Sequence, residues 1–172
     1  PYIIFCGVHF MAETADMLTK EDQKVILPDL NAGCSMADMA QEKEIQKAWE
    51  FIKSATSDKI IPITYINCAA TLKSFVGEHG GAICTSTNAE KVISWGLKQG
   101  EKLLFFPDQH LGRNTCFKLG IPLDEMVVYN PNYQNGGLTR EDIQKAKIIL
   151  WYGFCSVHQG FKVEHIAAIK KK

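Results

Sequence analysis

Two cysteines stand apart in this sequence because each follows an apolar run and a glycine. Cys34 lies in the segment Pro28–Ala37, after the run Lys24–Leu27. Cys155 follows the run Lys147–Tyr152 in the same way. Such runs are typical of buried strands, and ligands of open α/β sheets bind at the carboxyl ends of the strands. The backbone N–H groups at the start of a helix also favour the thiolate form of a nearby cysteine. We therefore expect both cysteines to lie at the ligand-binding edge of a sheet.

Thiolates are soft ligands that suit an iron–sulfur or zinc centre, but two are too few for either centre on their own. No pair of cysteines has the C-x-x-C spacing, which argues against a zinc ribbon, a thioredoxin motif and a ferredoxin run. Disulfides are not expected in an intracellular protein. The remaining cysteines are expected to be small buried hydrophobic residues; they are Cys6, Cys68, Cys84 and Cys116.

Polar side chains follow the other apolar runs. Tyr65 and Asn67 end one run, and we expect them to alternate along a strand and to face the same way. They would either hold a carboxylate or be merely polar residues at the end of the strand. Ser86 and Thr87 precede a helical pattern and suit a phosphate or carboxylate, although N-capping of that helix also explains them. His158 follows the last strand as a general acid or anion ligand, or as a helix-start residue bonded to backbone.

The elements that must position these residues alternate between strand and helix. Because the strands are nearly continuous apolar runs, we predict an α/β fold with parallel sheets and helices on both faces. Pro62 argues that its strand lies at an edge or that the proline is early in the strand. The predicted strands are 2–6, 24–28, 59–67, 82–84, 102–106, 126–129 and 147–152. The predicted helices cover 10–19, 35–54, 69–76, 89–98, a stretch ending near 119, one capped by Thr139, and a last one ending near 168.

An internal repeat is also indicated. Pro28-Asp29 and Pro107-Asp108 each follow a strand and precede a glycine. Upstream of each, Met11-Ala12-Glu13 matches Asn88-Ala89-Glu90 at nearly the same offset. The repeated unit is strand, helix, strand and Pro-Asp loop, which predicts a site built between related domains.

Composition excludes several classes of protein. The 19 basic and 19 acidic side chains balance, which argues against a dedicated nucleic-acid surface. No apolar run is long enough to span a membrane and no signal peptide is present, so we expect a cytoplasmic protein. The chain begins without methionine in what reads as a buried strand, and we expect that an N-terminal part is absent.

Together these motifs resemble those of quinolinate synthase, the iron–sulfur enzyme family of NAD biosynthesis. The motifs occur in the family's order across nearly the whole chain. They are Gly7–Ala15, Pro28–Ser35, Tyr65–Asn67, Cys84–Ser86, Pro107–Arg113 and Gly153–His158.

The resemblance implies three homologous three-layer αβα domains with parallel sheets, arranged about a pseudo-three-fold central site. Residues 1–34 would be the C-terminal part of the first domain, 35–154 the second domain, and 155–172 the start of the third. Each domain of the family supplies one cysteine to a [4Fe-4S] cluster. Cys34 and Cys155 would therefore be two metal ligands, and the third would come from the part of the last domain that this chain lacks.

The resemblance also implies an activity. The family condenses iminoaspartate with dihydroxyacetone phosphate to quinolinate, and the open iron of the cluster acts as a Lewis acid. By their match to family motifs, Tyr65 and Asn67 bind substrate, and Ser86 with its neighbour Thr87 contacts a carboxylate or phosphate. His158 lines the pocket near the cluster, and His158 and Tyr65 are the catalytic candidates. The aspartate-oxidising enzyme that supplies iminoaspartate is the implied partner.

Two departures and two alternatives stand beside this interpretation. The family's N-terminal His-x-Tyr motif and its C-terminal His-x-Glu motif are absent, so we expect that the chain alone does not turn over substrate. One alternative is a non-catalytic α/β module that binds a phosphate or dicarboxylate, with six structural cysteines. The other is a thiol enzyme that uses Cys34 as its nucleophile without metal.

Overall fold

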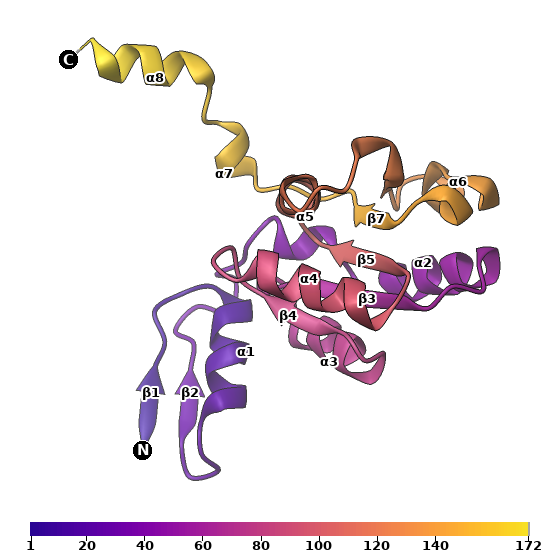
Figure 1. Ribbon diagram of the computed structural model, residues 1–172. Coiled ribbons are helices and arrows are strands. Elements are labelled where there is room, and N and C mark those ends of the chain that lie inside the picture. The colour runs from indigo at the N-terminus through magenta and orange to yellow at the C-terminus, as the bar shows by residue number, and fades with distance from the viewer. Residues whose placement is uncertain (172) are drawn as a thin grey trace.

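The computed structural model describes residues 1–171. They form two sheets, and the strands within each sheet are parallel (Figure 1). The smaller, N-terminal sheet pairs two strands in parallel, with Ile3 opposite Val25. A helix between the strands packs on this sheet, as the sequence pattern predicted. The three elements are β1 (Tyr2–Ile4), α1 (His9–Leu18) and β2 (Lys24–Ile26).

The larger sheet has five strands in the order β4-β3-β5-β7-β6, and each neighbouring pair is parallel. Five of the predicted strands correspond to these five, and three of them match to the residue. The strands are β3 (Ile60–Tyr65), β4 (Ala82–Cys84), β5 (Lys102–Phe106), β6 (Met126–Tyr129) and β7 (Ile148–Trp151).

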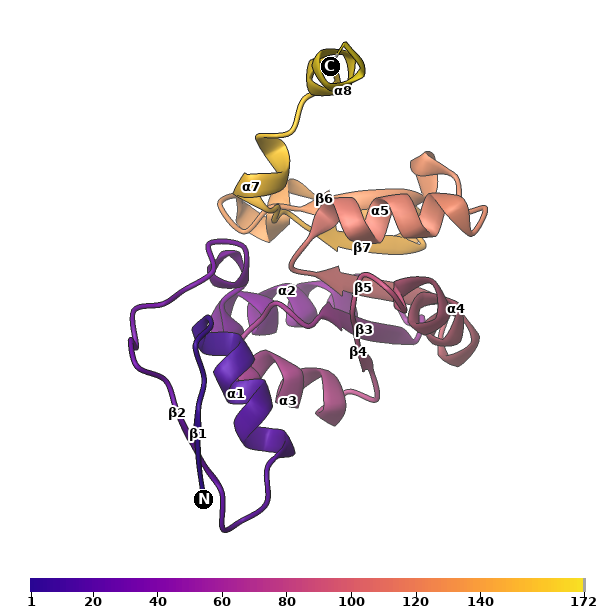
Figure 2. The same cartoon turned by 90° about the vertical axis from the view of Figure 1, so that its left-hand side faces the viewer.

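Helices cover both faces of the larger sheet (Figure 2). One face carries α2 (Glu42–Ala55), α3 (Ala70–Glu78) and α6 (Arg140–Lys145), and the other carries α4 (Ala89–Gln99) and α5 (Gln109–Lys118). Alternate side chains of β5 enter the two cores: Leu104 packs with α2 and α3, and Leu103 packs with α4. The predicted three-layer αβα architecture with a parallel sheet is confirmed.

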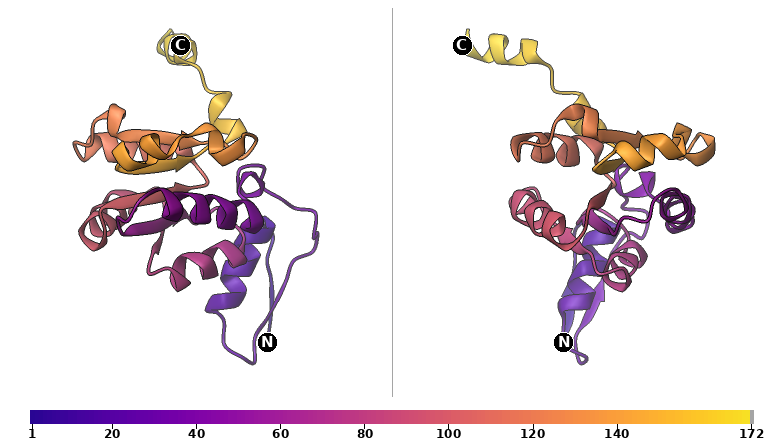
Figure 3. Two further views of the ribbon diagram at one scale, coloured as in Figure 1. Left: turned by 90° about the vertical axis from the view of Figure 1, so that its right-hand side faces the viewer. Right: turned by 45° about the vertical axis from the view of Figure 1, so that its right-hand side comes forward.

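The chain after β7 leaves the sheet. It forms α7 (Ser156–Gln159) and α8 (Val163–Lys170), and α8 projects away from the rest of the molecule (Figure 3). No residue of α8 is buried. Short 3-10 turns lie at Ala37–Met39, Leu123–Glu125 and Gln134–Gly137. Within residues 1–171, no helix combines the length and the apolar character needed to cross a membrane.

One sequence prediction about local structure was wrong. The helix expected from Ser35 is a 3-10 turn followed by α2, which begins only at Glu42. Cys34 therefore does not lie at the N-terminus of a long helix. For Pro62 the second of the two predicted alternatives holds, because it is the third residue of β3, which is an interior strand. The Pro62 carbonyl faces Gly81, on the side of β4. Strand β4 pairs with β3 only from Ile63 onward, so the N–H group that proline lacks would have had no partner in β4.

Helix α1 docks on α3 and so fixes the smaller sheet against the larger one. The Glu13 carboxylate accepts a hydrogen bond of 2.9 Å from the Ala70 N–H, at the first turn of α3. From α3, the buried Lys73 ammonium donates to the Thr14 hydroxyl at 2.8 Å and to the Phe10 carbonyl at 3.5 Å. Burial lowers the pKa of Lys73, against the opposing effects of Cys68 and Glu13.

This docking predicts a pH effect on stability. Because burial lowers the Lys73 pKa in the folded protein, the unfolded chain binds more protons there. The Lys73 contribution to the free energy of unfolding should therefore rise with pH, from the folded pKa up to the ordinary value of 10.5. Urea unfolding of the wild type and of Lys73→Met over the alkaline range measures this contribution as a difference.

The wild type should gain stability relative to Lys73→Met as the pH rises through this range. The matched control is Lys91→Met, a substitution of an exposed lysine on α4, whose curve should run parallel to the wild type. If the stability curve of Lys73→Met also ran parallel to that of the wild type, it would contradict a lowered pKa of Lys73 in the folded protein.

Candidate functional site

A cavity of about 410 Å³ lies at the carboxyl ends of β3, β4, β5 and β7. This is the switch point of the sheet, because the helix after β3 lies on one face and the helix after β5 lies on the other. The cavity brings together four of the residues that the sequence singled out. Its lining comprises Tyr65, Ser86, Asp108, His110, Leu111, Asn114, Cys155, His158 and Gln159.

Tyr65 is the last residue of β3 and is half-buried. Burial raises the pKa of Tyr65, and the Asp108 carboxylate raises it further. The neighbouring Ser86 side chain acts in the opposite direction and lowers the pKa. The phenol therefore remains neutral at physiological pH and can donate a hydrogen bond to an anionic ligand.

Ser86 and Thr87 do not cap the helix that follows them. The N-cap of α4 is Asn88, and its side chain turns back to accept from the Thr85 N–H at 2.6 Å and from the Thr85 hydroxyl at 3.1 Å. The capping explanation for Ser86 and Thr87 is therefore wrong. Ser86 faces the cavity, whereas Thr87 is exposed outside its lining.

Asn67 also lies outside the lining of the cavity. Strand β3 ends at Tyr65, and Asn67 occupies the bend that follows. The alternation of side chains applies only within a strand, so the prediction that Tyr65 and Asn67 share a face of one strand was wrong.

The loop that carries Cys155 is held against the loop after β5. The Gln109 N–H donates to the Gly153 carbonyl at 2.9 Å. Gly153 approaches so closely that a Cβ there would lie 2.1 Å from the Pro107 carbonyl oxygen. From this loop the chain passes to the half-buried Cys155 and to His158, which is exposed on α7 and lines the cavity.

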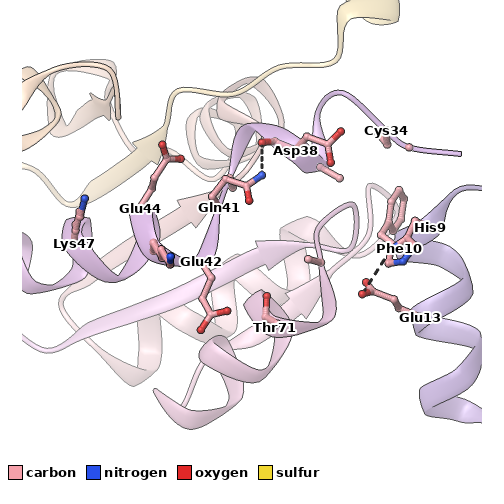
Figure 4. Close-up of a pocket in the computed structure, with 15 residues that line it drawn as sticks. His9, Phe10, Glu13, Cys34, Asp38, Gln41, Glu42, Glu44, Lys47 and Thr71 are labelled. Carbon is pink, nitrogen blue, oxygen red and sulfur yellow. Dashed lines mark hydrogen bonds and ion pairs between the residues drawn. The ribbon is translucent and has the colours of Figure 1, made fainter. Parts of the chain in front are cut away.

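Cys34 lines a second cavity of about 690 Å³, between α1 and the start of α2 (Figure 4). His9 and Glu13 form one wall, with 3.7 Å between the imidazole Nδ1 and the carboxylate. Asp38 and Gln41 lie on the other side. The His9 N–H donates to a carbonyl of the Cys34 loop, that of Ala32, at 2.7 Å, which ties this loop to α1.

The two cysteine loops meet although their cysteines line different cavities. The hydroxyls of Ser35 and Ser156 are 3.1 Å apart and form a hydrogen bond. Each serine directly follows one of the two cysteines. The structure thus brings Cys34 and Cys155 to neighbouring loops at one end of the molecule, from positions 121 residues apart.

Burial separates these cysteines from three of the others. Cys68, Cys84 and Cys116 are buried in the cores, as predicted. Burial raises the pKa of Cys68, and it raises the pKa of Cys84 and of Cys116 to about 12, so these thiols stay protonated. The prediction for Cys6 was wrong, because Cys6 is exposed beyond the end of β1.

The donor set fits part of a metal centre. Cys34 and Cys155 are half-buried free thiols on adjoining loops, so both sulfur atoms are accessible to a metal ion. Residues 1–171 hold no group of three or more ligating side chains that is able to complete a site. The two thiols therefore provide a portion of a ligand set.

The sequence analysis did not assign a role to Asp108, His110 and Asn114, which also line the cavity. The second Pro-Asp loop, after the apolar run of β5, was the signal that would have found them. From the sequence it was interpreted as part of a repeat and as a motif of the family resemblance, without a role for its side chains. The two loops do share a local bond, because the Asp29 carboxylate accepts from the Asn31 N–H at 2.9 Å and the Asp108 carboxylate from the His110 N–H at 2.8 Å.

The close approach at Gly153 predicts the effect of a small substitution. Gly153→Ala should lower the free energy of unfolding by about 1–3 kcal/mol, because the new methyl group meets a backbone carbonyl that cannot move alone. Urea unfolding measures this loss. Gly77→Ala is the matched control, since a Cβ there meets no atom within 4 Å, and it should leave stability unchanged or raise it. Equal stability of Gly153→Ala and wild type would contradict the packing described.

Fold and site define an α/β protein whose ligand-binding edge carries a phenol, a hydroxyl, a histidine and a thiol, with a second thiol on the adjoining loop. The family model described as "Quinolinate synthetase A protein" matches residues 1–172. The chain belongs to this family.

Curated relatives are similar along nearly the whole chain. Proteins named quinolinate synthase from Streptomyces coelicolor and Listeria monocytogenes are 52% and 55% identical, each over 99% of this chain. One from Corynebacterium glutamicum is 56% identical over 95% of it. These alignments cover 44%, 46% and 42% of the respective relatives, so the chain spans less than half the length of the curated relatives it matches.

Proposed function

We propose that this chain is part of a quinolinate synthase that condenses iminoaspartate with dihydroxyacetone phosphate to quinolinate, in the de novo synthesis of NAD. Membership of the family supports the class of enzyme. The observation that carries the proposal further is the meeting of the Cys34 and Cys155 loops through Ser35 and Ser156.

The proposed domain division agrees with the two sheets. Residues 1–34 contain the smaller sheet, and 35–154 contain the whole five-stranded sheet with the helices on its two faces. Residues 155–171 leave that sheet as α7 and α8. We place both cysteines next to these boundaries, which is where a site shared by three pseudo-symmetric domains would lie.

The proposed cofactor is a 4Fe–4S cluster for which Cys34 and Cys155 supply two thiolate ligands. When bound, the cluster would supply a Lewis-acidic iron for the substrate's oxygen atoms. The other ligands would have to come from outside residues 1–171, since these hold no larger group of ligating side chains.

The side chains of this chain would bind and orient the substrate. Tyr65 would donate from its neutral phenol to a substrate carboxylate, and Ser86 would add a hydroxyl beside it. His158, exposed at the same cavity, would transfer a proton as a general acid. Asn67 and Thr87 are proposed as substrate-binding residues on the family resemblance alone, because neither lines the cavity.

Two further proposals follow from the substrate's chemistry and the resemblance. Iminoaspartate is an imine and hydrolyses in water, so direct transfer from the aspartate-oxidising enzyme would protect it. A cytoplasmic location is proposed on the family resemblance alone.

Substitution of single thiols tests the iron–sulfur assignment. Cys34→Ser and Cys155→Ser in the intact protein should each reduce the bound iron and sulfide to near background after anaerobic reconstitution. Cys68→Ser is the matched control, since residue 68 is buried beside the Thr64 hydroxyl and lies outside both cavities. It should retain both elements and the visible charge-transfer absorption.

Equal effects of the three substitutions would contradict the singling out of Cys34 and Cys155. Absence of bound iron and sulfide from the reconstituted wild-type protein would leave the non-catalytic binding module as the better interpretation. Selective alkylation of Cys34 together with activity in the absence of iron would favour a thiol enzyme.

A further inference from the structure

The second Pro-Asp loop contains a buried carboxylate to which the proposed function gives no role. Asp108 is only 7% exposed and lies at the wall of the cavity. A carboxylate is costly to bury unless hydrogen bonds or charges compensate it. The Asp108 Oδ1 atom accepts from the His110 N–H at 2.8 Å and from the Leu111 N–H at 3.3 Å, at the start of α5. These bonds cap the helix and offset part of the cost.

The guanidinium on the same helix does not neutralise Asp108. Arg113 donates to the Gln109 side-chain oxygen at 3.0 Å and lies 3.4 Å from the imidazole Nδ1 of His110. In residues 1–171, no salt bridge involves Asp108. The buried charge of Asp108 is therefore compensated mainly by backbone N–H groups. The geometry of the turn depends on these hydrogen bonds.

The same turn holds the loop that carries Cys155. Gln109, next to Asp108, donates its N–H to the Gly153 carbonyl at 2.9 Å. On the other side of Asp108, the Pro107 carbonyl lies against the Gly153 backbone. Both contacts are made by Gly153, two residues before Cys155. A change in the turn at Asp108 should therefore shift the Cys155 thiol through this short backbone segment.

A second set of contacts, with Met39, also restrains the Cys155 loop. The Trp151 indole N–H donates to the Met39 carbonyl at 2.7 Å, and the Phe154 N–H donates to the Met39 sulfur at 3.4 Å. These contacts do not involve Asp108 and remain when it is changed. Loss of the turn should therefore loosen the loop locally without unfolding it.

We propose that Asp108 is a positioning residue for Cys155, acting by capping α5 and fixing the turn Pro107–Gln109 against Gly153. The proposal that this position matters for the cluster rests on the proposed function. The positioning itself does not, because it concerns only the accessibility of a thiol in the protein without metal.

The first test measures alkylation of metal-free intact protein by iodoacetamide, read at each cysteine by peptide mass spectrometry. Asp108→Ala removes the acceptor and should raise the alkylation rate of Cys155 by about five- to thirtyfold, the factor that corresponds to loss of an N-cap. The rate at Cys34 should stay unchanged. Asp108→Asn retains an N-cap oxygen and should restore the wild-type rate at Cys155.

A matched control separates positioning from general destabilisation. Asp142→Ala removes the carboxylate that accepts from the Thr139 N–H at the start of α6, a helix outside both cavities. It should lower stability to a similar extent and leave Cys155 alkylation at the wild-type rate. An unchanged Cys155 rate in Asp108→Ala, or an equal rise in Asp142→Ala, would overturn the proposal.

The second test uses the reconstituted protein. Asp108→Ala should weaken iron binding by about tenfold or more, as changes around metal ligands typically do, while Asp108→Asn and Asp142→Ala retain it. If wild-type protein also fails to bind iron, the proposed function fails, and the alkylation result still decides the role of Asp108. Wild-type iron affinity in Asp108→Ala would overturn its role in positioning the ligand.

Discussion

The candidate site depends on the contact between the Cys34 and Cys155 loops, and the hydrogen bond between Ser35 and Ser156 marks this contact. The bond itself joins two exposed hydroxyls and contributes about 1 kcal/mol at most. It is therefore too weak to hold the loops together. Stronger contacts on each side must place the two serines within reach of each other.

Stronger contacts of this kind are present on both sides of the two serines. On the Cys34 side, α1 is docked on α3 through Glu13 and the buried Lys73, and the Cys34 loop is bonded back to α1 at His9. On the Cys155 side, the backbone of Gly153 packs on Pro107. Packed backbone and buried polar pairs are stiff, so they determine where the thiols lie.

Burial then decides which thiols are suited to bind metal. Cys84 and Cys116 lie in the core between the sheet and the helices α4 and α5, where burial raises the pKa of each thiol to about 12. A thiolate is disfavoured at such positions. Cys34 and Cys155 are only half-buried and lie on loops, so the same chain holds structural thiols and candidate ligands at clearly different positions.

Most of the fold could be predicted from the sequence because its strands are strongly apolar. The boundaries of β4, β5 and β6 matched to the residue, and the helix capped by Thr139 formed as predicted. The prediction failed where helical periodicity competes with a loop. The residues after Ser35 have the pattern of a helix, but they form a 3-10 turn whose Met39 binds the Cys155 loop.

The site was predictable only in part, for a physical reason. The carboxyl end of a parallel strand is recognisable in sequence, and this located Tyr65, Ser86, Cys155 and His158 at one cavity. The direction of a side chain beyond a strand end depends on tertiary contacts, which is why Asn67 was misplaced. The role of the turn at Asp108 depends on its contact with Gly153, a residue far along the chain, and no local pattern shows this contact.

The most direct measurement is a crystal structure of the intact protein after anaerobic reconstitution, with iron located by its anomalous scattering. The account predicts one iron–sulfur cluster at the contact of the two loops, with the Sγ atoms of Cys34 and Cys155 both bonded to iron. A cluster bound without either thiol, or iron at any of the buried cysteines, would contradict the account.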